Sequence, residues 1–289
     1  MLPSVVPYTS TDMPNSDALT IFNTPKLNDA TLLLALTGWM DGGLVSTGTV
    51  KHLMRGRDLT RVAYIEPAGF YIENFPGSME IAAAFRPRVK YEDGVVVEFD
   101  VPNNELLADP AANLAFFVGK EPNVGWQPFA EHLFDVAKLI GVTRIIFMGS
   151  FGGTVPHTRE PRMFGSVSAL RLRPLLRQHG LTPSTYEGPA SFATYLLTIA
   201  PKHGVEMLSI AAEIPGYLNG LNPLSIEAVT RRLARIMNLP VDLAELREAS
   251  TQWEMKVSEA VEKDEELAGT VRKLEDQYDN ELIASPENG

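Results

Sequence analysis

The sequence contains no cysteine, and this absence excludes disulfide bonds, thiolate metal ligands and a cysteine nucleophile. No apolar run approaches the roughly 18 residues that a membrane-spanning helix needs. The first basic residue is Lys26, so the N-terminus lacks the positive region of a secretory signal. We therefore expect a cytoplasmic protein without a membrane partner. With 289 residues, of which 45% are hydrophobic, the chain can bury a core without covalent crosslinks.

Negative charge outnumbers positive charge, and the imbalance is greatest near the C-terminus. The chain has 25 Lys and Arg against 36 Asp and Glu, a net charge of −11. Residues 242–289 hold 14 acidic and 5 basic side chains, a net of −9, whereas residues 1–241 hold 22 acidic and 20 basic side chains, a net of −2. Because an acidic surface repels phosphate backbones, nucleic acid is not an expected partner.

Short apolar runs alternate with helical patterns from residue 30 onward. Residues 30–38 (ATLLLALTG) and 61–65 (RVAYI) have the continuous apolar character of buried strands. Residues 43–55 lie between them and carry apolar side chains at helical spacing. Strand, helix and strand in this order indicate a βαβ unit with parallel strands. The turn Asp93-Gly94 favours a tight hairpin of residues 88–91 and 95–99, which makes the expected sheet a mixed one.

The alternation continues to the last quarter of the chain. Asn222-Pro223 has the cap and first-position residues that begin a helix. The further elements expected are strands near 114–118, 144–148, Thr185-Tyr186 and 207–212, and helices near 129–140, 168–179 and 191–203.

The C-terminal segment is predicted to form one or two long helices. Asp242 and Glu245 resemble a capping box, and no proline occurs between Pro240 and Pro286. A narrow apolar stripe at three- and four-residue spacing follows, and such a stripe packs on the body, on its own hairpin or on another subunit. We divide the chain into an extended segment (1–24), an α/β core (25–221), a helical region (222–284) and a disordered tail (285–289).

The first candidate site is the turn Gly38-Trp39-Met40-Asp41-Gly42-Gly43. It follows a buried strand and precedes a helix, which is where open α/β sheets bind ligands. Asp41 is either a cation ligand or base, or a residue that caps the helix. The turn does not match the GxGxxG fingerprint of dinucleotide sites.

The second candidate is Gly149-Ser150-Phe151-Gly152-Gly153-Thr154, at the end of another apolar run. Met148 stands where a GxSxG nucleophile elbow needs glycine, and no lysine completes a phosphate-binding loop. Ser150 as a nucleophile is therefore the weaker interpretation, and a close crossing with another backbone is the stronger one.

The third candidate is the polar stretch from Pro156 to Pro161. It places His157, Thr158 and Arg159 between two prolines that disfavour a helix. His157 is a candidate acid or base and Arg159 a candidate anion ligand, or both lock the loop or a subunit interface. The histidines have no HxH or HExxH spacing, so we expect no metal site.

Two further loops carry related patterns, Tyr186-Glu187-Gly188-Pro189 and Ile214-Pro215-Gly216-Tyr217. If these loops converge with the first three candidates on one sheet edge, a shallow pocket forms there.

Several of these motifs, taken in order, resemble the proteasome assembly chaperone 2 family in its bacterial and archaeal branch, whose members also carry a loose ATP-grasp label. The matching pieces are GWMDGG (38–43), Glu121-Pro122 with Trp126, VPHTREP (155–161), YEGP (186–189), IPGY (214–217), Asn222-Pro223, Trp253-Glu254 and Lys273-Leu274-Glu275. The resemblance implies a three-layer α/β/α fold of the phosphorylase/hydrolase-like type with a mixed, mostly parallel sheet, C-terminal helices and homo-oligomerisation. Eukaryotic members help to assemble proteasome α-rings through protein contacts.

The leading hypothesis is therefore a non-catalytic, homo-oligomeric interaction protein that needs no cofactor and binds itself and another protein complex. The alternative is a hydrolase-, phosphorylase- or ligase-like enzyme whose site contains Asp41, His157 and Arg159. The residues expected at ligand or interface loops are Gly38, Trp39, Asp41, Gly42, Gly152, Gly153, Pro156, His157, Thr158, Arg159, Glu187 and Tyr217.

Overall fold

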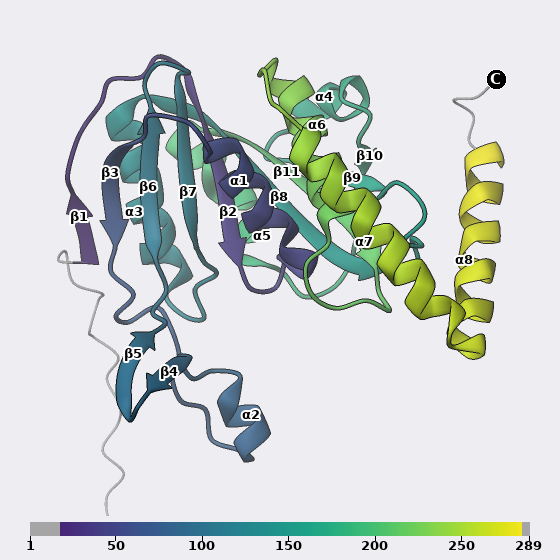
Figure 1. Cartoon of the computed structure of the whole chain (residues 1–289). Coiled ribbons are helices and arrows are strands. Elements are labelled where there is room, and N and C mark those ends of the chain that lie inside the picture. The colour runs from purple at the N-terminus through teal and green to yellow at the C-terminus, as the bar shows by residue number, and fades with distance from the viewer. Residues whose placement is uncertain (1–17, 285–289) are drawn as a thin grey trace, which may run out of the picture.

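The computed structural model describes residues 18–284, and its strands form two separate sheets (Figure 1). The strands are β1 (Leu19–Ile21), β2 (Ala30–Thr37), β3 (Thr60–Ile65), β4 (Val89–Glu92), β5 (Val95–Phe99), β6 (Asn104–Asp109), β7 (Leu114–Lys120), β8 (Val142–Gly153), β9 (Met163–Val167), β10 (Thr182–Pro183) and β11 (Glu206–Pro215). The α-helices are α1 (Val45–Met54), α2 (Met79–Ala83), α3 (Trp126–Ile140), α4 (Arg173–Gln178), α5 (Phe192–Ile199), α6 (Pro223–Met237), α7 (Ala244–Glu262) and α8 (Glu265–Ala284). Short 3-10 turns cover Gly42–Leu44, Leu170–Leu172 and Ala200–His203.

The main sheet has the order β1-β3-β6-β7-β2-β8-β11-β9-β10, and its central strands β7, β2, β8 and β11 are mutually parallel. Side chains of β2 alternate between two cores: Leu32 and Leu34 pack with α3 and α5, and Leu33 packs with α1 and α6. A strand that is covered on both faces is apolar along its whole length, which explains the run at 30–37. The expected three-layer α/β/α fold with a mixed sheet is confirmed.

The antiparallel part of the main sheet comes from strands that the sequence pattern did not predict. β6 pairs antiparallel with both β3 and β7, and β9 pairs antiparallel with β11. β2 and β3 run in the same direction, as expected of a βαβ unit, but β6 and β7 lie between them. Both β6 and β9 are short and contain only two or three large apolar residues each, so their periodicity is weak.

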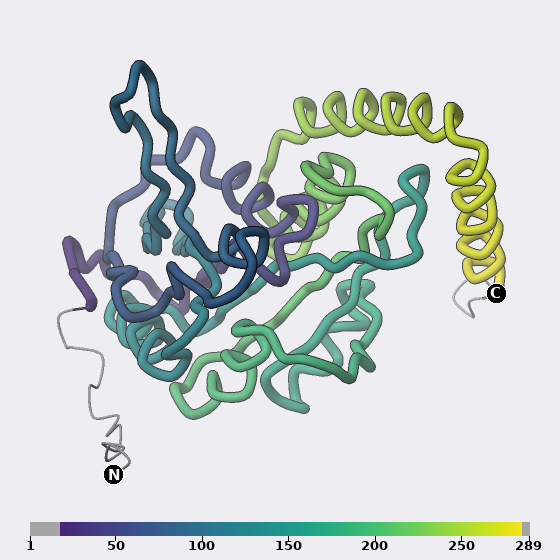
Figure 2. Tube along the Cα trace, turned by 90° about the horizontal axis from the view of Figure 1, so that it is seen from below, coloured from purple at the N-terminus to yellow at the C-terminus, as the bar shows by residue number. Residues whose placement is uncertain are grey.

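The predicted hairpin forms, but it does not join the main sheet. β4 and β5 pair around Asp93 and Gly94, whose φ angles of 48° and 80° are those of a tight turn. Together with α2 they build a projection, residues 74–101, which we call the arm. Figures 1 and 2 show that the arm extends away from the body. The prediction of the hairpin from the sequence is confirmed, but the prediction that it joins the main sheet is wrong.

Elements near the C-terminal half follow the expected order with shifted ends. The side chain of Asn222 accepts a hydrogen bond from the Ser225 amide (2.9 Å) and so caps α6, as predicted. The strand expected near Thr185 is β10, which ends two residues earlier at Pro183. The run around 144–148 belongs to the much longer strand β8.

The acidic segment forms two helices, α7 and α8, joined at Lys263 and Asp264. The amide of Ala244 donates to the Asp242 carboxylate (2.9 Å) just before α7. α6 packs into the hydrophobic core, whereas α7 and α8 lie on the outside of the molecule (Figure 2). Residues 1–17 of the extended segment expected at 1–24, and the tail expected at 285–289, lie outside the described residues. Within the rest of that segment, Leu19–Ile21 forms β1 and pairs with β3 at the edge of the main sheet. Within residues 18–284, no helix combines the length and apolarity needed to cross a membrane.

The end of α3 depends on a glycine. Gly141 has φ +89°, and a Cβ at this position would overlap the carbonyl group of Leu27. The same segment is tied by hydrogen bonds from Leu27 to Ile140 (2.9 Å) and from Ala30 to Gly141 (3.1 Å). We expect Gly141→Ala to lower the free energy of unfolding by roughly 2–4 kcal/mol, because backbone strain and overpacking add.

Gly56→Ala is the matched control, since Gly56 also has a positive φ (+70°) but nothing within 4 Å of the added Cβ. This substitution should lower the free energy of unfolding by about 1 kcal/mol. Urea unfolding of both variants measures the difference, and equal losses would contradict the role of the Leu27 contact.

Candidate interaction and ligand sites

The turn at 38–43 uses its carboxylate to begin α1. Asp41 is buried and accepts hydrogen bonds from the amide (3.1 Å) and the hydroxyl (2.8 Å) of Thr47. Burial raises the pKa of Asp41 above its ordinary value, and these hydrogen bonds oppose that rise. The carboxylate is thus engaged by the first turn of the helix.

The glycine-rich stretch at 149–154 is the end of β8, where strands cross closely. Ser150 is buried, its amide donates to the Met40 carbonyl (2.8 Å), and its hydroxyl donates to the Gly42 carbonyl (2.6 Å). The amide of Gly216 donates to the carbonyl of Gly153 (3.0 Å), and a Cβ on Gly216 would lie 2.9 Å from that oxygen. This is the close backbone crossing that the sequence indicated.

His157 is buried at the centre of a hydrogen-bonded chain. Its amide donates to the Tyr217 hydroxyl oxygen (2.9 Å), and its Nδ1 lies 2.7 Å from the same oxygen. On the other side of the ring, Nε2 lies 3.1 Å from Ser258 Oγ of α7, so the imidazole links Tyr217 to α7. Burial lowers the pKa of His157 and favours the neutral ring, against the opposing charge of Glu275.

The residues that follow His157 are held by α8. Arg159 makes a bidentate pair with Asp279, with N···O distances of 2.8 and 2.7 Å, and Thr158 donates its hydroxyl to Glu275. The Tyr278 hydroxyl donates to the carbonyl of Glu160 (2.9 Å). We call loop 155–162, with the faces of α7 and α8 that contact it, the clamp. The acidic C-terminal helices therefore pack on their own chain.

Glu213 is a site residue that the sequence analysis missed. It is buried, and its carboxylate accepts from the amides of Thr154 (2.6 Å) and Val155 (3.2 Å) and from Arg162 (3.1 Å). A Cβ on Gly153 would overlap this side chain, so the glycine leaves room for the carboxylate. The available signal was a single acidic residue inside the buried run 207–215.

A cavity of about 760 Å³ opens at the carboxyl ends of the central strands. Three of the predicted loops converge there and contribute Trp39, Gly152 and Tyr186, and Glu187 is exposed beside them. The loops at 156–161 and 214–217 do not line the cavity, because Tyr217 turns to His157 instead. The cavity is lined by Trp39, Met40, Phe151, Gly152, Phe164, Ser166, Ser184, Thr185, Tyr186, Pro189, Ser191, Thr194, Leu197, Ser209 and Ala211.

One carboxylate fixes the rim of this cavity. Glu121 accepts from the amide of Trp39 (3.1 Å), which follows Gly38, and from the amide of Phe192 at the start of α5 (2.6 Å). Gly38 has φ +124°, a conformation that glycine adopts without strain. The turn at 38–43 and the first turn of α5 are thereby joined.

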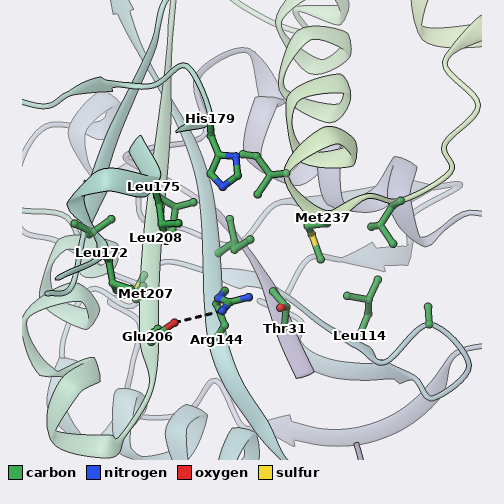
Figure 3. Close-up of a pocket in the computed structure, with 15 residues that line it drawn as sticks. Thr31, Leu114, Arg144, Leu172, Leu175, His179, Glu206, Met207, Leu208 and Met237 are labelled. Carbon is green, nitrogen blue, oxygen red and sulfur yellow. Dashed lines mark hydrogen bonds and ion pairs between the residues drawn. The ribbon is translucent and has the colours of Figure 1, made fainter. Parts of the chain in front are cut away.

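A second, smaller cavity of about 320 Å³ lies at the opposite edge of the sheet, where β8 and β11 begin. Figure 3 shows its apolar side chains, such as Leu175, Leu208 and Met237, around the opening. It also shows Arg144 paired with Glu206 (3.3 Å). This charged rim makes the second cavity chemically different from the first.

Asp41, His157 and Arg159 are not brought together as one constellation. Asp41 binds Thr47, His157 binds Tyr217 and Ser258, and Arg159 binds Asp279. Within residues 18–284, no group of three His, Asp or Glu side chains is arranged to hold a metal ion.

The arm exposes most of its apolar side chains. Every residue of β4 and β5 is exposed, with Val95 at 64% and Tyr91 at 62%. The other exposed apolar residues of the arm are Phe75, Met79, Ile81, Val89, Val96, Val97, Phe99 and Val101. An exposed apolar surface of this kind is typical of protein interaction sites.

The sequence model of one protein family, the PAC2 family, matches residues 35–261 of the chain. Among solved structures, a protein of unknown function from Mycobacterium tuberculosis is similar at 25% identity and a TM-score of 0.80, over 94% of this chain and 92% of that one. A proteasome-assembly chaperone homologue of the same organism is similar at 26% identity and a TM-score of 0.71, over 83% of this chain and 99% of that one. PbaB, an archaeal proteasome activator from Pyrococcus furiosus, shares the fold at 20% identity and a TM-score of 0.63, over 84% of this chain and 97% of that one. No curated protein matches the chain.

The clamp predicts a specific role for the guanidinium of Arg159. Arg159→Lys keeps the positive charge but loses the bidentate geometry with Asp279. We expect amide hydrogen exchange in α8 to become several-fold faster, because local opening of the helix is easier. Arg55→Lys is the control, since Arg55 forms an exposed pair with Glu245 far from α8 (2.7 Å). The account would be contradicted if Arg159→Lys left the exchange rate of α8 unchanged, or if Arg55→Lys raised that rate equally.

The lowered pKa of His157 predicts a pH-dependent stability. The pKa of the histidine ring is 6.5 in the unfolded chain and lower in the folded one, so below pH 6.5 the unfolded chain binds a proton more readily. The neutral ring therefore contributes fully to the free energy of unfolding above pH 6.5, and this contribution is lost as pH falls through the lowered pKa. At pH 8, His157→Gln should cost about 1–3 kcal/mol, because the buried hydrogen bonds to Tyr217 and Ser258 are disturbed. The difference in free energy of unfolding between wild type and variant should become smaller towards pH 5. Urea unfolding at both pH values measures this difference, and a difference that stays constant would show that the pKa of His157 is the same in the folded and unfolded states.

Proposed function

Because the chain belongs to the PAC2 family, we propose that it acts through protein–protein contacts as an assembly-chaperone-like protein, and that it does so as a homo-oligomer. The 26% identical proteasome-assembly chaperone homologue supports this role. In addition to its own copies, the proposed partner is another protein complex, for which proteasome subunits are the first candidates. The proposal requires neither a cofactor nor a metal ion.

The observation that carries the proposal is the exposed arm. A hairpin of two strands is at best marginally stable in water, and further strands or packing are needed to make it stable. The β4–β5 hairpin is separate from the main sheet, and all its residues are exposed. We infer that the arm is covered in the working protein.

A second copy of the chain is the occupant that the arm favours. Its edge strands offer unpaired backbone groups, so two arms related by a twofold axis can extend one sheet. The alternative contact between copies, through the C-terminal helices, would bring together two acidic segments, since residues 242–289 carry a net charge of −9. Like charges disfavour that arrangement. The acidic helices instead suit a basic surface on a different partner.

The remaining predicted residues have a supporting role in this proposal. The core at 25–221 positions the arm, and the region at 222–284 presents acidic charge on a fixed surface. Gly152, Gly153 and Pro156, with His157, Thr158 and Arg159, set the path of the loop on which α7 and α8 rest. The separate contacts of Asp41, His157 and Arg159 lend no support to a shared catalytic site.

The homo-oligomer is tested by light scattering after size exclusion at micromolar concentration. The wild-type mass should be at least twice the chain mass of 31.7 kDa. The double variant Val96→Asp/Phe99→Asp should elute as a monomer, because it places charges on the exposed arm. Leu170→Asp is the matched control, as Leu170 is 87% exposed but follows β9, at the other end of the sheet. A monomeric wild type, or an oligomer that survives the arm substitutions, would overturn the proposed interface.

The same proteins test the assembly role. Native mass spectrometry of the chain mixed with proteasome subunits of its own organism should show a complex that weakens with salt, because the acidic helices contribute long-range attraction. An absence of any complex at low salt contradicts this partner while leaving the light-scattering result untouched.

A further inference from the structure

The cavity of about 760 Å³ has an unusual lining that the proposed function does not use. Among its lining residues there is no Asp, Glu, Lys, Arg or His, although the chain as a whole is 21% charged. Six of the residues carry hydroxyls on Ser or Thr, and four carry aromatic rings. The volume falls within the roughly 300–1,000 Å³ of ordinary small-molecule sites.

The floor of the cavity is a built feature of the sheet. Ser166 of β9 lies directly opposite Ser209 of β11, and Phe164 lies opposite Ala211 two residues along. Because side chains two residues apart share a face, the two hydroxyls, the ring and the small alanine all face the cavity. Ala211 leaves the space that a larger side chain would fill.

The hydroxyls of the floor are available to a ligand. Among the described residues, the floor side chains of Ser166 and Ser209 make no hydrogen bond to the protein, and neither does the side chain of Thr185 in the exposed loop that follows β10. They are not enclosed in the core, since each contributes to the cavity wall. A ligand that fills the cavity without hydrogen-bonding them would leave these groups unpaired, which costs binding energy.

The walls supply flat apolar surfaces. Phe151 of β8 lies 5.7 Å from Phe164, measured between ring centroids, with the planes at 53°. Trp39 and Tyr186 are 64% and 69% exposed at the rim, and the Tyr186 hydroxyl donates to the Pro189 carbonyl (3.2 Å). Since Glu121 holds the backbone of Trp39 to the start of α5, this rim is preorganised.

We propose that the cavity binds a neutral saccharide. The C–H face of a sugar ring packs on an aromatic ring, and its hydroxyls both donate to and accept from Ser and Thr. A charged ligand would be desolvated without a counter-charge, and a purely apolar ligand would leave the floor hydroxyls unpaired. An uncharged, polyhydroxylated ring satisfies both constraints.

Saturation-transfer NMR and calorimetry on the full chain test the proposal with glucose, maltose, trehalose and N-acetylglucosamine as probes. At least one of the four should bind saturably at millimolar concentration. Glucose 6-phosphate and gluconate should bind roughly tenfold more weakly or not at all, since the lining offers no positive charge. No saturable binding of any neutral probe, or tighter binding of the charged compounds, would overturn the proposal.

Substitutions on the floor locate the binding. Ser166→Ala/Ser209→Ala should weaken it by roughly tenfold through the loss of two hydrogen bonds, and Ala211→Leu should abolish it by filling the cavity. Thr270→Ala on α8 is the control and should bind like the wild type, because Thr270 bonds only to the Glu266 carbonyl (3.0 Å). Circular dichroism verifies the fold of each variant, and the serine pair decides the question if Ala211→Leu does not fold. Binding that the serine pair leaves unchanged means that the sugar binds elsewhere, which contradicts the assignment.

Discussion

The buried carboxylate of Glu213 is the constraint on which the C-terminal half of the structure depends. It lies on β11 and accepts hydrogen bonds from the two consecutive amides that follow β8 and from Arg162. A buried carboxylate is tolerated only when such donors surround it, so the chain from Thr154 to Arg162 is fixed around this group. Arg162 in turn pairs with Glu281 (2.6 Å) and stacks on the ring of Tyr278 at 4.5 Å. Glu213 and Arg162 therefore connect α8 to the core, in addition to the contacts of Thr158 and Arg159 with the same helix.

This arrangement separates the molecule into surfaces of different chemistry. The arm is apolar and carries its residues on a thin hairpin, whereas α7 and α8 present acidic charge on helices braced against the body. Figures 1 and 2 place the arm and α8 on different sides of the molecule. An apolar surface gives affinity by burying area, and a charged one gives steering and selectivity. The two surfaces therefore lie apart and differ in their chemistry.

The elements buried on both faces could be predicted from the sequence, and those stabilised by distant contacts could not. The run at 30–37 and the start of α6 at Asn222-Pro223 carry local signals, and both were located correctly. β6 and β9 have few large apolar residues, and their identity as strands comes from their neighbours in the sheet. The polar loop around His157 was recognised as unusual, but its partners on α8 lie more than 100 residues away. The periodicity of apolar residues along the sequence gives no information about pairing between such distant residues. Glu213 was missed for the same reason, because its donors lie about 50 to 60 residues earlier, in the segment between β8 and β9.

The cavity and the clamp meet on one strand, and this explains why the glycines of β8 occur where they do. Phe151 faces the cavity, and Thr154, three residues on, donates to Glu213 in the direction of the clamp. Between them the strand must leave room for the Glu213 side chain, which a Cβ at Gly153 would overlap, and a Cβ at Gly216 would lie 2.9 Å from the Gly153 carbonyl oxygen. The strand therefore borders an open, hydroxyl-lined hollow at Gly152 and a closely packed carboxylate at Gly153. A loop-like sequence pattern at 149–154 is the consequence of this packing, because the backbone there is an extended strand with little space for side chains.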